Sequence, residues 1–169
     1  MKTAIFPGSF DPITNGHIKT IERASKLFDK IYFVVLTNTT KKYLFDVTER
    51  VELAAESLKF LPNVEVISRT ASLTVDVAHE LHADFILRGL RNEQDFGYER
   101  AIAAINKTQD EKLETVFFLA DPEESYISSS MIKEVAIFDG KLEQLVPVEV
   151  ATALKEKLRK SADESTTKQ

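Results

Sequence analysis

The sequence predicts a doubly wound α/β fold, in which helices cover both faces of a five-stranded parallel sheet. Short apolar runs alternate along the chain with segments of helical periodicity. One of these runs, Ile31–Leu36, is apolar or aromatic throughout, which is typical of a strand buried on both faces. The 169 residues suffice for one domain with a sizeable core, and we find no internal repeat or interdomain linker.

The expected strands are short runs bounded by turn-forming or helical segments. They are Thr3–Phe6, Ile31–Leu36, Val64–Ile67, Asp84–Leu87 and Thr115–Leu119. Since a helical segment separates each strand from the next, the strands should run parallel in a Rossmann-like sheet.

The first two helices are predicted from apolar spacing and from a capping residue. A helix over about 16–28 has Ile18, Ile21, Ala24 and Phe28 at helical intervals. Thr48 is interpreted as the N-cap of the second helix. Its apolar positions are Val51, Ala54, Ala55 and Leu58.

Further helices are expected over about 74–82, 92–107 and 129–138. A last amphipathic helix begins near Pro147, which suits a first helical position. The domain is predicted to span residues 1–160. Residues 161–169 are polar after Ala162 and are expected to form a disordered tail.

Composition excludes several classes of function. The formal charge of −5 is unfavourable for a broad nucleic-acid surface, and the absence of cysteine excludes disulfides and thiolate chemistry. No apolar run approaches the roughly 20 residues of a membrane helix, and the N-terminal residues do not have the pattern of a signal peptide. A cytoplasmic protein without membrane or nucleic-acid partners is expected.

In a doubly wound sheet, ligands bind at the carboxyl ends of the strands, so the loops there are the candidate site. The first of these loops contains Gly8, Ser9 and the segment Thr14-Asn-Gly-His17. His17 falls in the first turn of the next helix, where free amides and the helix dipole favour an anion. A histidine there can donate a hydrogen bond to a phosphate oxygen.

Three later loops carry groups suited to phosphate. Lys41 and Lys42 follow the second strand, and Arg88-Gly-Leu-Arg91 follows the fourth. Arginine forks match phosphate oxygens bidentately. Ser128, Ser129 and Ser130 begin the fifth helix. Their hydroxyls and amides could bind phosphate oxygens.

Simpler interpretations stay open for each group. The lysines could be solvated surface residues, the arginines could pair with Glu93 or Asp95, and one serine could serve only as a cap. His79 and His82 are interpreted as surface or partly buried residues rather than metal ligands. The motifs G-x-x-x-x-G-K-[ST], G-x-G-x-x-G and G-x-S-x-G are absent.

The loop motifs resemble those of a known family. Thr14-Asn-Gly-His17 fits the [HT]-x-G-H signature of the nucleotidyltransferase α/β phosphodiesterase superfamily. Together with Lys41-Lys42, Arg88–Arg91, Asp95–Glu99, Asn106 and Ile127–Val135, it resembles the bacterial phosphopantetheine adenylyltransferases over residues 3 to about 158. The chain departs from that family's pattern at Ser9, where threonine is common, at Tyr43, where proline is usual, and at Gly97, where an acidic residue is expected.

The resemblance implies adenylyl transfer from ATP to 4′-phosphopantetheine, which gives dephospho-coenzyme A and pyrophosphate with Mg²⁺. His17, Lys41 and Arg88 would be catalytic. The substrate phosphate and pantetheine arm would contact Ser9, Lys41, Thr74 and Arg88. The residues implied for ATP are Ser9, Phe10, His17, Gly89, Leu90, Arg91, Glu99, Glu124, Ser125, Tyr126, Ile127, Ser128, Ser129 and Ser130. The resemblance also implies a homohexamer and coenzyme A as a feedback ligand.

Two alternatives remain at this point. A related transferase could act on nicotinamide mononucleotide or glycerol phosphate, and the fold could serve as a non-catalytic nucleotide sensor. The presence of His17 argues against the sensor, because a sensor has no need of a group that stabilises a transition state.

Overall fold

The computed structural model describes residues 1–38, 40–70 and 72–166, with side chains as far as residue 160. It confirms the predicted fold class. Five parallel strands form one sheet in the order β3-β2-β1-β4-β5. The strands are β1 (Thr3–Gly8), β2 (Lys30–Thr37), β3 (Val64–Thr70), β4 (Phe85–Leu90) and β5 (Glu114–Leu119). All five predicted strands are present.

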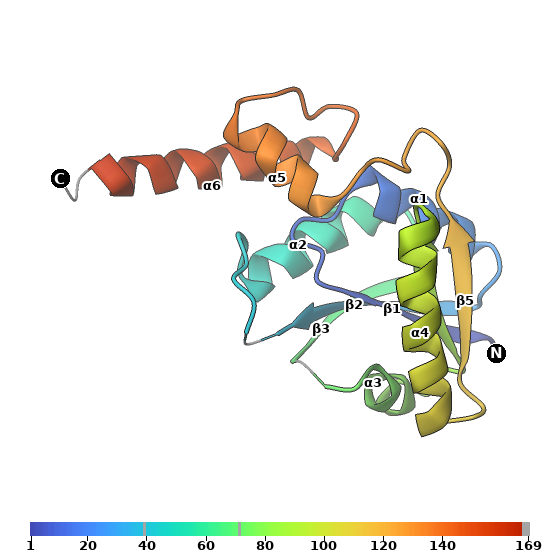
Figure 1. The fold of residues 1–169 in the computed structure, drawn as a ribbon. Helices are drawn as coiled ribbons and strands as arrows, with labels where there is room; N and C mark the ends of the chain where they lie inside the picture. The colour runs from blue at the N-terminus through green and yellow to red at the C-terminus, as the bar shows by residue number, and fades with distance from the viewer. Residues whose placement is uncertain (39, 71, 167–169) are drawn as a thin grey trace.

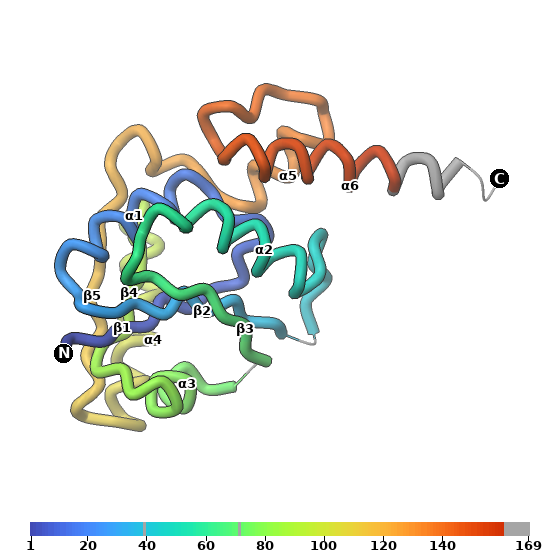
Figure 2. Tube along the Cα trace, turned by 180° about the vertical axis from the view of Figure 1, so that it is seen from behind, coloured from blue at the N-terminus to red at the C-terminus, as the bar shows by residue number. Residues whose placement is uncertain are grey.

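Helices cover both faces of the sheet (Figure 1). On one face lie α1 (Asn15–Ser25) and α2 (Val47–Leu58), and on the other lie α3 (Thr74–Glu80) and α4 (Glu93–Gln109). The last two helices, α5 (Ser129–Ile137) and α6 (Val148–Thr166), lie beyond α1 and α2 on the same side, as the reverse view also shows (Figure 2).

Alternation along the strands divides the core into two layers. Ala4 and Phe6 of β1 point into the layer under α1 and α2, whereas Ile5 points into the layer under α3. All three are at most 4% exposed. Burial on both faces explains why the strands are continuous apolar runs in the sequence.

The start of α2 differs from the prediction, whereas the last helix begins next to Pro147 as expected. The N-cap of α2 is Asp46 and not Thr48. The Asp46 carboxylate accepts from the Glu49 N–H at 2.9 Å, and the Glu49 carboxylate accepts from the Asp46 N–H at 2.8 Å. This reciprocal capping box satisfies two amide donors, which a Thr48 cap would leave unpaired. Pro147 immediately precedes α6, and its carbonyl accepts the Ala151 N–H.

The C-terminal part of the chain is described only in part. The backbone of α6 is helical to Thr166, and residues 167–169 lie outside the described residues. The domain limit at residue 160 and the disordered tail therefore stay predictions. In the described part of the chain, no helix is both long enough and apolar enough to span a membrane.

The strand order locates the expected site. From β1 the chain builds β2 and β3 on one side, and it then crosses to place β4 on the other side of β1. The connections leaving β1 and β4 therefore diverge to opposite faces. This divergence opens a crevice at the carboxyl ends of the two strands.

Candidate active site

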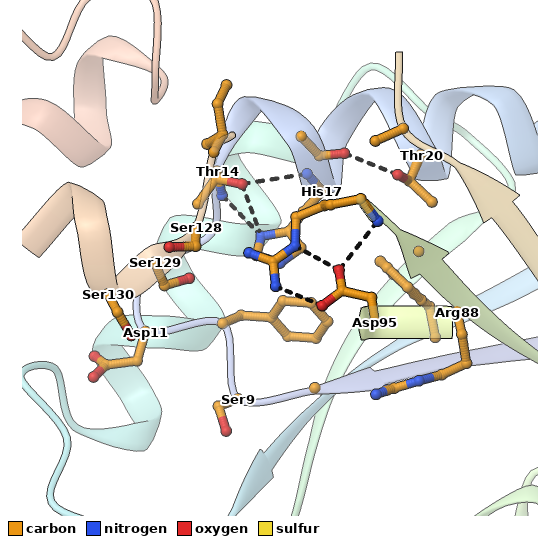
Figure 3. Close-up of a pocket in the computed structure, with 18 of the residues that line it drawn as sticks. Ser9, Asp11, Thr14, His17, Thr20, Arg88, Asp95, Ser128, Ser129 and Ser130 are labelled. Carbon is orange, nitrogen blue, oxygen red and sulfur yellow. Dashed lines mark hydrogen bonds and ion pairs between the residues drawn. The ribbon is translucent and has the colours of Figure 1, made fainter. Parts of the chain in front are cut away.

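A cavity of about 460 Å³ occupies the predicted crevice. The loops after β1, β2 and β4 and the starts of α1 and α5 form its walls. In Figure 3, Asp11 and the serines of α5 lie on one side, Arg88 and Asp95 lie on the other, and His17 lies between them.

A second cavity of about 330 Å³ adjoins the first on the side of α3 and α4. Thr74 and Asn106 are among the residues that line it. Both cavities share seven lining residues, which form a common wall: Pro7, Gly8, Ser9, Lys41, Tyr43, Arg88 and Glu99. The geometry thus offers two adjacent compartments with two cationic side chains, Lys41 and Arg88, in the wall between them.

Most residues singled out in the sequence line these cavities. Those on the first cavity are Ser9, Phe10, His17, Lys41, Lys42, Arg88, Gly89, Leu90, Arg91, Glu99, Glu124, Ile127, Ser128, Ser129 and Ser130. Thr74 lines the second. Ser125 and Tyr126 line neither cavity. The Ser125 hydroxyl donates to the Pro122 carbonyl, and Tyr126 is 56% exposed. Contact of these two residues with a nucleotide stays a prediction.

The capping box of α1 fixes the tautomer of His17. The Thr14 backbone N–H donates to the His17 Nδ1 at 3.1 Å, and the Thr14 hydroxyl oxygen accepts from the His17 N–H at 3.3 Å. A backbone N–H can only donate, so Nδ1 carries no proton. In the neutral ring the proton is therefore on Nε2.

The electrostatic surroundings keep His17 neutral. Burial is the main cause that lowers the pKa of the imidazole from 6.5 to about 4, and the charges of Arg91 and Arg88 add to the effect. At neutral pH, His17 is thus a neutral N–H donor at the start of a helix. This state suits a hydrogen bond to a phosphate oxygen.

Arg88 joins the two central strands and the first turns of α4. Its Nε and one terminal nitrogen donate to the buried Glu99 carboxylate, and its other terminal nitrogen donates to the Pro7 carbonyl at 2.7 Å. A guanidinium has five N–H donors, so two remain for a ligand. Glu99 therefore orients Arg88 in the common wall.

Arg91 faces a carboxylate within its own turn. Its Nε donates to the Asp95 Oδ2 at 2.8 Å, and this hydrogen bond lowers the pKa of Asp95. The sequence left open a pairing of the arginines with Glu93 or Asp95. The structure shows that pairing for Arg91 and pairs Arg88 with Glu99 instead.

The serines of α5 divide their roles. The Ser128 hydroxyl caps the helix by accepting from the Met131 N–H, and the Ser129 hydroxyl donates to the Pro12 carbonyl at 2.8 Å. Ser130 is exposed at the cavity edge. The interpretation that one serine caps the helix is thus correct for Ser128. The backbone amides in the first turn of α5 remain available to a ligand.

Sequence reasoning missed Asp11 and Lys133. The buried Asp11 carboxylate accepts from the N–H groups of Leu44 and Phe45 at 2.9 Å and pairs with Lys133 at 3.0 Å. It thereby ties the first loop to the loop after β2 and to α5. Lys133 follows Ser129 by four residues, so helical spacing alone could have placed it on the cavity face.

Phe10 closes the base of the first cavity. Its backbone has a φ of 46°, and its ring stacks on Phe33 with ring centroids 3.9 Å apart. The ring also meets His17 edge-on at 5.0 Å. A Cβ at Gly8 would lie 2.7 Å from the Phe10 Cζ, so any larger residue at position 8 would force the Phe10 ring to shift.

The carboxylates of the first cavity are paired with basic side chains. Asp11, Asp95, Glu99 and Glu124 each pair with a lysine or arginine. Among the residues that the structure describes, no group of three His, Asp or Glu side chains could hold a metal ion. Magnesium binds to oxygen ligands, and the four cavity carboxylates already bond to these basic side chains.

Comparisons with known proteins agree with this geometry. Residues 5–135 match the cytidylyltransferase-like family model. A phosphopantetheine adenylyltransferase from Lactobacillus gasseri is 58% identical over 97% of this chain and 99% of that protein. One from Lactobacillus johnsonii is 59% identical over the same shares. One from Latilactobacillus sakei is 51% identical over 96% of this chain and 98% of that protein.

A solved structure is similar in fold. A putative nicotinate-nucleotide adenylyltransferase from Vibrio parahaemolyticus superposes with a TM-score of 0.66, at 22% identity, over 94% of this chain and 95% of that one. Identity this low supports the fold alone. The near full-length identity to the curated sequences is decisive, and the chain belongs to the phosphopantetheine adenylyltransferase family of nucleotidyltransferases.

Proposed function

We propose that the protein transfers the adenylyl group of ATP to 4′-phosphopantetheine, giving dephospho-coenzyme A and pyrophosphate. The observation that carries the proposal is the pair of cavities with a common wall. One compartment suits a nucleotide, the other suits a pantetheine arm, and Lys41 and Arg88 stand where the two reacting phosphates would meet. Names of close relatives give independent support.

The proposed chemistry is an in-line displacement at the α-phosphorus of ATP. An oxygen of the 4′-phosphate forms the new P–O bond, and the bond to the β-phosphate bridging oxygen breaks with its electrons leaving on pyrophosphate. A phosphate monoester is already ionised near neutral pH, since its second pKa is about 6. No general base is then required, and catalysis rests on positioning and charge stabilisation.

Each charged group has a distinct role in this proposal. The Nε2–H of His17 donates to a non-bridging oxygen of the α-phosphate, where negative charge increases in the transition state. Arg88 uses its two free N–H donors, and Lys41 its ammonium, to hold the 4′-phosphate. Arg91 and the amides at the start of α5 hold the β- and γ-phosphates.

Mg²⁺ is proposed as part of the nucleotide substrate rather than as a resident ion. The cavity carboxylates are paired with cations, which is unfavourable for a protein-held site. Magnesium commonly binds through substrate phosphates and water, and this mode needs few protein ligands.

The test is release of pyrophosphate with different acceptors. The protein is incubated with ATP and Mg²⁺ plus 4′-phosphopantetheine, nicotinamide mononucleotide or glycerol phosphate. Release with 4′-phosphopantetheine alone is expected. Release only with another acceptor would support the related transferase, and ATP binding without release would support the sensor.

The assignment of the two cavities has its own test. Because Arg88 lies in the common wall, Arg88→Ala should weaken binding of 4′-phosphopantetheine or lower kcat while ATP affinity changes little. Isothermal titration with each substrate measures both affinities. A loss of affinity for ATP alone would mean that each substrate occupies the cavity assigned here to the other.

Assembly and regulation complete the proposal. We propose a homohexamer in the cytoplasm, with coenzyme A as a feedback ligand that occupies the same cavities. Exposed apolar side chains on α4, including Tyr98 at 67% and Ile105 at 63%, give association a physical basis. Sedimentation velocity tests the assembly, and competition of coenzyme A with ATP tests the regulation.

A further inference from the structure

Arg50 of α2 is a buried arginine beside the active site. Only 1% of the residue is exposed, and its guanidinium donates to the Ser9 carbonyl at 2.7 Å, the Leu36 carbonyl at 2.9 Å and the Thr37 hydroxyl at 2.8 Å. Its Nε has no hydrogen-bond partner among the described residues. One side chain thus holds the loop after β1 against the end of β2.

Arg50 forms no ion pair with a carboxylate among the described residues. Arginine remains protonated in proteins, and none of the ion pairs in the described part of the chain includes Arg50. Its partners are neutral oxygens and the ring of Tyr43, whose centroid lies 4.1 Å from the guanidinium carbon. A buried cation with only neutral partners is costly and favours an anion nearby.

Arg50 also fixes the plane of one peptide in the first loop. The Ser9–Phe10 peptide is trans, so the Phe10 N–H points opposite to the Ser9 carbonyl that Arg50 holds. Arg50 lines neither cavity, whereas Ser9 and Phe10 line the first. The Phe10 N–H has no hydrogen-bond acceptor among the described residues.

Phe10 is in the left-handed region, with a φ of 46°. A bulky residue persists there only where its surroundings hold it. The bond from Arg50 to the preceding carbonyl is one such restraint, and the packing of the Phe10 ring on Phe33 is another.

We propose that Arg50 is a positioning residue, which locks the Ser9–Phe10 peptide so that the Phe10 N–H faces the first cavity as a donor to a substrate phosphate. Its buried charge adds to the positive potential at that point. Arg50 itself does not touch substrate. The rate effect described next rests on the proposed function, whereas the binding effect needs only ATP.

Arg50→Lys keeps the charge and removes the fork that reaches three acceptors. Loss of an oxyanion donor typically lowers kcat by about 10²–10³-fold, and a misdirected donor should cost about 10- to 100-fold. The KM for 4′-phosphopantetheine should change little. Arg69→Lys is the matched control, because Arg69 pairs with Glu80 at the surface and lines neither cavity.

The spectroscopic readout is the Phe10 amide in ¹⁵N-labelled protein titrated with ATP. A hydrogen bond to phosphate should move this amide proton downfield in the wild type and in Arg69→Lys. The movement should be lost or strongly reduced in Arg50→Lys. A purely structural role would lower the unfolding midpoint without removing this response from the folded fraction.

Where Arg50→Lys fails to fold, Thr37→Val decides the question. This change removes one acceptor of the guanidinium at a residue outside both cavities. A smaller loss of kcat and of the Phe10 response would support the proposal. Wild-type kcat and an unchanged Phe10 response in the folded variant would overturn it. The proposal would also be overturned if ATP shifted the amide signal of Ser129 in the wild type but not that of Phe10. Because the titration uses ATP alone, it remains decisive if 4′-phosphopantetheine proves not to be the acceptor.

Discussion

At the scale of single residues, His17 provides the sharpest test of mechanism. The neutral Nε2–H of His17 is expected to stabilise the transition state more strongly than it stabilises bound ATP. His17→Ala should therefore lower kcat by about 10²-fold or more, equivalent to about 3 kcal/mol, while ATP affinity is largely kept. Steady-state kinetics and ATP titration measure the two quantities. His79→Ala serves as the control, because His79 is exposed and lines neither cavity.

The titration of His17 gives a second prediction at this scale. An unfolded imidazole titrates near 6.5 and the folded one near 4, so the unfolded chain binds more protons between these values. The contribution of His17 to stability is complete above about 6.5 and is lost as the pH falls through 4. The free energy of unfolding, measured in urea, should fall more between pH 7 and pH 5 for the wild type than for His17→Gln. An NMR titration of the ring that gave a normal pKa would contradict this account.

At the scale of elements, the loop after β1 and the helix α4 respond oppositely to the same substitution. Gly8→Ala would place a Cβ 2.7 Å from the Phe10 ring, and the overpacking should cost about 1–3 kcal/mol and lower activity. Gly97→Ala in α4 meets no atom within 4 Å and should stabilise by about 0.4–1 kcal/mol. Thermal unfolding of both variants measures the contrast. Equal effects would show that Phe10 moves aside freely.

At the scale of the whole molecule, the first half of α6 packs against the rest of the domain and stabilises it. Val150 and Leu154 are fully buried, and Lys157 donates to Glu49 of α2. Truncation after Lys160 keeps these contacts and should leave activity and the unfolding midpoint unchanged. Truncation after Leu145 removes them and should destabilise the protein severely. Loss of activity in the shorter deletion would show that the last nine residues contribute to the site.

Local chemistry made much of the fold predictable. Strands buried on both faces are continuous apolar runs, and their alternation with amphipathic helices leaves few topologies. The prediction of Thr48 as the N-cap of α2 is wrong. Thr48 is a good capping residue by itself, but the pair Asp46 and Glu49 has the spacing of a capping box, which satisfies two amides.

The positively charged residues of the site could be predicted from the sequence, but the carboxylates that pair with them could not. The motifs place Arg88 at a strand end, but pairing with Glu99 depends on how α4 packs against β4, which no local pattern contains. Arg50 is a second example. The sequence pattern of α2 predicts an exposed charge at this position, and only the tertiary structure buries it beneath the first loop.

The bonds across the first cavity join distant parts of the chain. Asp11 pairs with Lys133 across 122 positions, and Ser129 reaches Pro12 across 117. A nascent chain that ends before α5 cannot complete the first cavity, however well its early strands have formed. If ATP binds there as proposed, its binding is linked to the folding of nearly the whole polypeptide. Bound ATP should protect amides throughout the sheet against hydrogen exchange by global unfolding, and not only those that contact it.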